Sequence, residues 1–208
     1  MDDRIAGYPL LLFGLVAVLL SGCASTAPTR FYVLTAVPET APRRPQAGDG
    51  RPLAIGVGPV ALPRYLDRPQ VATHASPHEL RFAEFDQWAE PLQDGVTSVL
   101  AENLSHVLGT DHVATHPWPR SAPVAYQVVV RMIHFEGTLD GQSQLTAQWQ
   151  IVDAEDQKEL MWKTSRFQSP VETADYRSMV AALSHSLGAL SQDIAVALMA
   201  LTQKQAVR

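Results

Sequence analysis

Cysteine is almost absent from this sequence, since Cys23 is the one cysteine among 208 residues. A single thiol excludes an internal disulfide framework and a cysteine-rich zinc site, so Cys23 must react with another molecule or carry a modification. Basic residues are also few, with 16 Lys and Arg against 21 Asp and Glu and a formal net charge of -5. Nucleic acids are held by dense basic patches, so this balance argues against a nucleic-acid-binding protein.

The sequence also lacks the common catalytic and metal-binding motifs. It contains no Gly-x-Ser-x-Gly elbow, no His-Glu-x-x-His pair and no phosphate-binding loop. His112 and His116 have the spacing of two ligands on one helical face, but Pro117 and Pro119 follow and are incompatible with a helix. We therefore predict a protein that is not an enzyme and has no catalytic residue and no metal site.

An apolar run from Leu10 to Leu20 precedes the cysteine. Its eleven residues are too few to span a membrane, which needs about 20 helical residues, but they are typical of a signal-peptide core. The next residues, Leu20-Ser21-Gly22-Cys23, resemble the lipobox of bacterial lipoproteins. We therefore predict that residues 1–22 are a lipoprotein signal peptide and that Cys23 carries S-diacylglycerol and N-acyl chains.

The residues after the cysteine indicate where the protein is anchored. Lipoproteins with an aspartate directly after the cysteine tend to stay in the inner membrane, whereas this chain has Ala24. We therefore expect attachment to the periplasmic face of the outer membrane, with two or more acyl chains making the anchor stable. Residues 23–30 form the lipidated N-terminus and a short tether, and residues 31–208 form one domain.

Hydrophobic periodicity predicts an α/β domain. Strands are expected at 31–34, 53–60, 71–74, 80–85, 126–135, 145–152 and 160–167, with an exposed Pro-rich loop at 38–52. A helix is expected to open at Trp88-Ala89-Glu90-Pro91-Leu92, with Pro91 in its first position and Gly109 as its C-terminal cap. The last helix, at about 174–201, carries one apolar stripe, which favours packing on the core over packing on a partner helix.

One predicted strand is rich in glutamine. Gln142, Gln144, Gln148 and Gln150 recur at even positions and place their amides on one face of the strand. This face is either simply solvated, which is the more common case, or a polar surface for a partner.

The lipobox and four further motifs together resemble those of the ABC-type transport auxiliary lipoproteins, which are similar to paraquat-inducible protein C. The motifs are Phe31-Tyr32-Val33-Leu34, Ile55-Gly56-Val57-Gly58-Pro59-Val60 with Leu62-Pro63, Tyr65-Leu66-Asp67-Arg68-Pro69-Gln70, and Trp88-Ala89-Glu90-Pro91-Leu92. The resemblance covers nearly the whole mature chain. One departure is His74, at the end of the strand after Val71, where we expect a basic residue.

This resemblance implies a fold and a function. The fold is a three-layer α/β domain with a mixed β-sheet, similar to anticodon-binding and TolB N-terminal domains. The function is that of a non-enzymatic outer-membrane subunit of an MCE-type lipid transport system, which docks the periplasmic MCE-domain protein and supports envelope integrity. A ring-shaped homo-oligomer is a further implication.

The two most specific motifs supply the predicted partner-binding residues. These are Arg64, Tyr65, Leu66, Asp67, Arg68, Trp88 and Glu90. Aromatic side chains and arginine are enriched at protein interfaces, which favours this interpretation. A structural alternative remains for each motif, namely a turn pinned by an Asp-Arg pair and a hydrophobic staple formed by Trp88 before Glu90.

Two other functions remain open at this level. One is a periplasmic lipid carrier, which needs an apolar pocket large enough for acyl chains. The other is a structural envelope lipoprotein that binds peptidoglycan or an assembly machine.

Overall fold

The computed structural model describes residues 27–37 and 53–206. The predicted signal peptide, Cys23 and the expected loop at 38–52 lie outside the described residues. The strands are β1 (Arg30–Tyr32), β2 (Ile55–Ala61), β3 (Gln70–Ser76), β4 (Glu79–Trp88), β5 (Val113–Thr115), β6 (Tyr126–Gly137), β7 (Gln142–Asp153) and β8 (Glu159–Pro170). The helices are the 3-10 turn η1 (Arg64–Leu66), α2 (Leu92–Leu108) and α3 (Tyr176–Ala206).

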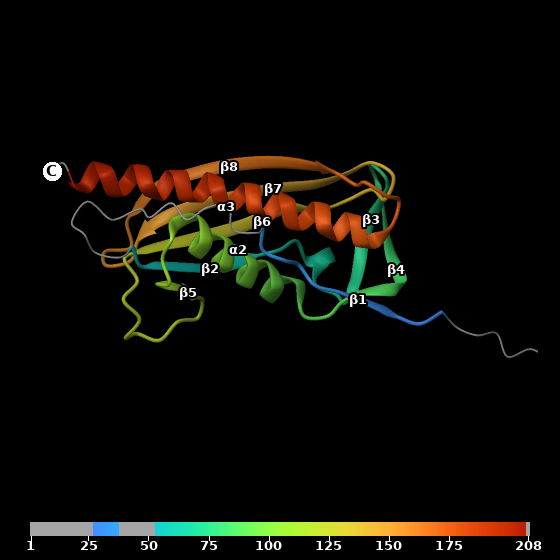
Figure 1. Ribbon diagram of the computed structural model, residues 1–208, viewed down its shortest axis with the longest axis horizontal. Coiled ribbons are helices and arrows are strands. Elements are labelled where there is room, and N and C mark those ends of the chain that lie inside the picture. Colours follow the sequence, from blue (N-terminus) through green and yellow to red (C-terminus); the bar gives the residue numbers. More distant parts are fainter. Residues whose placement is uncertain (1–26, 38–52, 207–208) are drawn as a thin grey trace, which may run out of the picture.

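The strands form two mixed sheets, and the long helices cover the larger one. The three-stranded sheet has the order β1-β4-β3, and the five-stranded sheet has the order β5-β2-β6-β7-β8. Helix α2 packs against β2 and β5, and α3 packs against β6, β7, β8 and α2 (Figure 1). The predicted class, a three-layer α/β domain with a mixed β-sheet, is therefore confirmed, although the strands form two mixed sheets rather than one.

Alternation along the strands builds the core as predicted. Leu145, Ala147, Trp149 and Ile151 of β7 are all buried beneath the helices. The apolar stripe of α3 faces the same core, with Met179, Val180, Leu183, Leu187, Leu190, Ile194 and Leu198 buried. The core-facing interpretation of the last helix is therefore confirmed. None of the helices in the described ranges is both long and apolar enough to cross a membrane.

The start of α2 and one strand differ from the sequence-based expectation. Strand β4 continues to Trp88, whose backbone N–H donates to the Pro69 carbonyl at 2.7 Å. Because that strand-like pairing holds the chain extended, Pro91 is the non-helical N-cap and the helix begins only at Leu92. Strand β5 was not predicted, since three residues are too few to show an alternation.

Each of the two long helices has one end capped by a residue type that is typical of that position. Gly109 adopts a left-handed conformation with φ 59°, so it caps α2 as predicted. At the start of α3, a carboxylate oxygen of Asp175 accepts the Ser178 backbone N–H at 2.8 Å. This bond and the Thr173 hydroxyl lower the pKa of Asp175, so the charged carboxylate caps the helix.

Strand β1 is fastened to β4 by a buried carboxylate. The Arg30 guanidinium donates to both carboxylate oxygens of Asp86, at 2.8 and 3.1 Å. The Tyr32 hydroxyl donates to the same carboxylate at 2.7 Å, and burial together with this contact raises the pKa of Tyr32. Parallel pairing with β4 adds backbone bonds, so this short strand is held in a defined position.

The segment after β1 is fastened to the helices. The backbone N–H of Thr35 donates to the Ser184 hydroxyl on α3, and that of Val37 donates to the Asn103 side chain on α2 at 2.9 Å. The Val37 side chain packs on Gly188 in α3, where any Cβ would overlap it. Residues 30–37 are thus fixed to the three-stranded sheet at one end and to both long helices at the other.

We predict that Gly109→Ala lowers the free energy of unfolding by about 1 kcal/mol, because alanine is disfavoured at positive φ. Urea unfolding of the mature chain measures the change. The matched control is Ser98→Ala at an exposed position within α2, which should leave stability unchanged or slightly higher. Equal stabilities of Gly109→Ala and the parent chain would contradict the capping role.

Candidate partner-binding site

The motif at residues 64–68 forms η1 and the turn that follows it. Leu66 points into the core with 3% exposure, Tyr65 is half-buried, and Arg64, Asp67 and Arg68 are exposed. Backbone hydrogen bonds to the carbonyls of Pro63, Arg64 and Leu66 shape the turn. Within the described residues Asp67 forms no ion pair with either arginine, so the backbone rather than an Asp-Arg pair holds the turn.

Beneath the motif lies Glu136 of β6, whose carboxylate is fully buried. Its Oε2 accepts the Tyr65 hydroxyl at 3.0 Å and the Phe135 backbone N–H at 2.7 Å. Its Oε1 lies 3.2 Å from Nε2 of His74 and 2.9 Å from Nδ1 of His134. Two donors and two histidine ring nitrogens therefore surround the buried carboxyl group, so both of its oxygens have polar partners.

These contacts join elements that are distant in sequence. Tyr65 comes from η1, His74 from the three-stranded sheet, and Glu136 from the five-stranded sheet. Burial and the neighbouring Glu136 carboxylate raise the pKa of Tyr65, so its hydroxyl remains a donor. His74 thus contacts the carboxylate from the position where we expected a basic residue.

Phe82 of β4 lies beside the exposed residues 64–68 and is itself exposed, although Leu80 and Phe82 alternate with Arg81 and Ala83 along the strand. The Arg68 guanidinium lies 3.8 Å from the centre of the Phe82 ring, which is 38% exposed. Ala83 is buried instead. The β3–β4 register shifts between Gln70 and Ala72, and such an irregularity changes which side chains face the core. A local sequence pattern carries no signal for it.

The motif at residues 88–92 is joined to the turn after η1 by the hydrogen bond from the Trp88 N–H to the Pro69 carbonyl. The Trp88 side chain is 7% exposed and belongs to the core, whereas Glu90 is exposed beside the start of α2. Trp88 and Leu66 therefore support the surface from within. The candidate site consists of the exposed residues Arg64, Asp67, Arg68, Phe82 and Glu90, and its partner-binding role stays a prediction.

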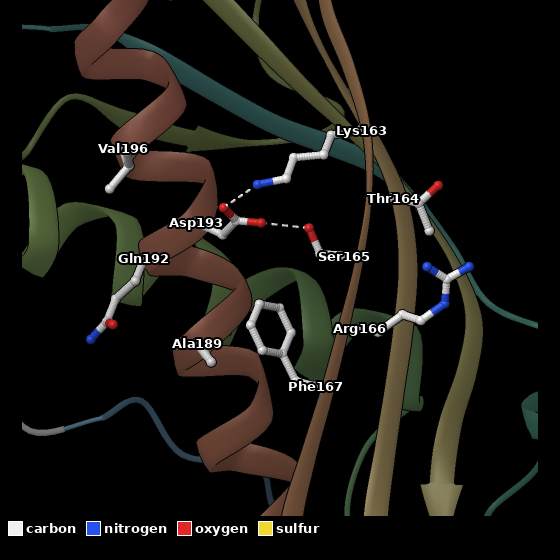
Figure 2. A pocket seen from close by; sticks show the side chains of 9 residues that line it. All are labelled: Lys163, Thr164, Ser165, Arg166, Phe167, Ala189, Gln192, Asp193 and Val196. Atoms are coloured by element: carbon white, nitrogen blue, oxygen red, sulfur yellow. Dashed lines mark hydrogen bonds and ion pairs between the residues drawn. The ribbon is translucent and has the colours of Figure 1, made fainter.

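A hollow lies between β8 and α3, at residues outside the sequence motifs (Figure 2). It has a volume of about 490 Å³ and opens to solvent. One Asp193 carboxylate oxygen pairs with Nζ of Lys163 at 2.5 Å, and the other accepts the Ser165 hydroxyl at 2.5 Å. Ser165 in turn accepts the indole N–H of the buried Trp149 at 2.9 Å. This chain of bonds ties α3 to the last strand.

The histidines considered as metal ligands are not arranged for that role. His112 and His116 flank the extended strand β5, so a spacing of four does not place them on one helical face. His116 instead meets the Trp118 ring edge-on at 5.5 Å. In residues 27–37 and 53–206 no group of three His, Cys, Asp or Glu side chains is placed to hold a metal ion.

The chain is similar to a protein family in sequence and to solved structures in fold. A family model described as ABC-type transport auxiliary lipoprotein component matches residues 32–195. The crystal structure of protein XCC0632 from Xanthomonas campestris has a TM-score of 0.69 at 18% identity, over 85% of this chain and 98% of its own. That of an uncharacterized protein has a TM-score of 0.66 at 20% identity, over 83% and 99%. At these identities the two structures show the fold alone. No curated protein matches the chain.

We predict that Glu136→Gln lowers the free energy of unfolding by about 2 kcal/mol or more, because the new amide group would face buried donors. Urea unfolding measures the loss. Tyr65→Phe, which removes one donor, should cost about 1 kcal/mol. Glu84→Gln is the control, since it makes the same change at an exposed position of β4. A Glu136→Gln protein as stable as the Glu84→Gln protein would contradict the role assigned to the carboxylate.

Proposed function

This chain belongs to the family of ABC-type transport auxiliary lipoproteins, and we propose from that premise that it is the outer-membrane subunit of an MCE-type lipid transport system. It docks the periplasmic MCE-domain protein and performs no chemistry itself. The observation that carries the proposal is the exposed half of the motif at residues 64–68, supported from beneath by the Glu136 carboxylate. A surface that is rigid before binding loses little conformational entropy on docking.

The chemistry of the exposed residues supports protein docking. Arg68 over the ring of Phe82 combines a cation with apolar area, and Arg64 and Asp67 add charges of both signs beside it. Arginine and aromatic side chains dominate the energetics of many protein interfaces. None of these exposed side chains is paired with a general base or nucleophile in the described structure, in keeping with a binding role.

The hollow between β8 and α3 (Figure 2) does not support a role as a lipid carrier. Its lining includes Lys163, Arg166, Gln192 and Asp193, and acyl chains would have to lie against these polar groups. Ligand pockets for apolar molecules are mainly apolar and bury most of the ligand. This hollow is open to solvent and would not bury most of a ligand, so it does not meet the second condition.

The anchor and the assembly state complete the proposal. We propose that Cys23 carries the lipid, that Ala24 directs the protein to the periplasmic face of the outer membrane, and that several copies associate as a homo-oligomer. Two or more acyl chains suffice for stable attachment.

We predict that a photoreactive amino acid at position 68 crosslinks to the MCE-domain protein in intact cells. The same residue at position 203, exposed on the last turns of α3, is the control and should give no such adduct. Adducts from position 68 to other copies of this chain alone would assign the surface to the homo-oligomer and contradict the docking role.

We also predict that Cys23→Ala moves the protein from the membrane fraction to the soluble periplasmic fraction, because no acyl chain can then be attached. Fractionation with immunoblotting measures the distribution. Ser25→Ala, two residues away, should leave it unchanged. A Cys23→Ala protein that still fractionated with the outer membrane would show that the anchor lies elsewhere.

A further inference from the structure

Two of the most exposed apolar side chains lie on the short segment that follows the proposed tether. Phe31 is 64% exposed and Val33 is 53% exposed, whereas their neighbour Leu34 is buried and Tyr32 is partly buried. Alternation along the extended chain therefore directs Phe31 and Val33 to one outer side. Tyr32 and Leu34 hold the segment to the fold, and neither Phe31 nor Val33 is needed for that purpose.

Residues 30–37 are fixed to the rest of the fold, although the outer side of this segment is exposed to solvent. Arg30 and Tyr32 grip Asp86, and the backbone at Thr35 and Val37 is bonded to α3 and α2. Because the backbone of residues 30–37 is already fixed, little further backbone entropy is lost when the Phe31 and Val33 side chains are covered by a less polar medium. Their exposure is a fixed feature of the described structure, and their apolar area is free to enter a less polar medium.

The place of the segment in the molecule restricts what can cover it. Strand β1 lies at one end of the long axis, and the C-terminal end of α3 lies at the other (Figure 1). Seven residues lie between Cys23 and Phe31, so their Cα atoms are at most about 29 Å apart at full extension. A chain anchored at Cys23 therefore keeps this end of the domain within reach of the bilayer surface.

We propose that Phe31 and Val33 enter the bilayer at the boundary between headgroups and acyl chains, as a second contact beside the lipid on Cys23. The inference rests on the proposed lipid attachment. A tether this short gives the patch a high effective concentration at the membrane, so a small apolar area is enough for lasting contact. The Arg30 guanidinium is 62% exposed beside the patch and can meet phosphate groups of the lipids while it holds Asp86.

The bilayer explains the patch better than a protein partner does. Within the reach of the tether the membrane is always present, whereas a partner protein is present only when assembled. The patch is also small, with two apolar side chains, and protein interfaces usually need a larger buried area. Contact with the membrane would set the orientation of the domain, with β1 toward the lipid and the C-terminal end of α3 away from it.

The test uses labels on single introduced cysteines in the lipidated protein. The Cys23 sulfur is then a thioether, so Phe31→Cys or Val33→Cys provides the one reactive thiol for an environment-sensitive fluorophore. Val196→Cys is the matched control, because Val196 is 60% exposed on α3 and is also apolar. Far-ultraviolet circular dichroism checks that each labelled protein is folded.

The labelled proteins are bound to vesicles of phosphatidylethanolamine and phosphatidylglycerol. At positions 31 and 33 we expect a blue-shifted emission and about fivefold weaker quenching by acrylamide than in solution, because the interface excludes the aqueous quencher. At position 196 neither quantity should change.

Three results would overturn the inference, and they have different meanings. Labels at positions 31 and 33 that stay open to acrylamide on sedimenting vesicles would overturn the membrane contact and leave the anchor intact. Protein that does not sediment with vesicles would overturn the anchor and the contact together. Shielding that appears without vesicles and rises with protein concentration would assign the patch to contact between copies of the chain.

Discussion

The buried carboxylate of Glu136 is the contact on which the candidate site depends. A carboxyl group without exposure is tolerated only when hydrogen-bonding partners surround it, and here the partners come from η1, β3 and β6. Neither the motif at residues 64–68 nor the three-stranded sheet can move relative to the five-stranded sheet without breaking one of these bonds. The exposed arginines of the motif are therefore presented from a fixed base, although they make few contacts of their own.

A second carboxylate, that of Asp86, has the same effect on the N-terminal segment. It binds Arg30 and Tyr32, and the residues that follow are held by Ser184 and by Asn103. Gly188 of α3 makes room for this segment. Glycine within a helix is unfavourable, but any larger residue at this position would displace the Val37 side chain. Residues 30–37 are thus part of the folded domain.

Much of the fold follows from local pattern, whereas the site follows from long-range pairing. Alternation in β7 and the stripe of α3 predicted which residues are buried, and Gly109 marked the end of α2. The division into two sheets, the strand β5 and the outward side chain of Phe82 were not predicted, because pairing partners and register shifts leave no local periodicity. The contacts of Glu136 were missed for the same reason, since Tyr65, His74 and Glu136 meet only after both sheets form. Motif resemblance did not distinguish the buried Leu66 and Trp88 from the exposed Arg64 and Arg68, and the partner-binding role of this stretch stays a prediction.

The two surfaces together restrict how a transport partner would meet this protein. Tyr65 of the motif shares the Glu136 carboxylate with His74 of β3, and Arg68 lies over Phe82 of β4. Strand β1 is paired with β4, so both surfaces adjoin the three-stranded sheet, which lies at one end of the molecule (Figure 1). Helix α3, with 31 residues and a length of about 46 Å, extends from that end along the long axis. With β1 at the bilayer, as proposed, a partner docked on Arg64 and Arg68 would sit close to the membrane surface, and the far end of α3 would point away from it. The Asp86 and Glu136 contacts are made within the domain, and they keep the two surfaces in a fixed position relative to each other.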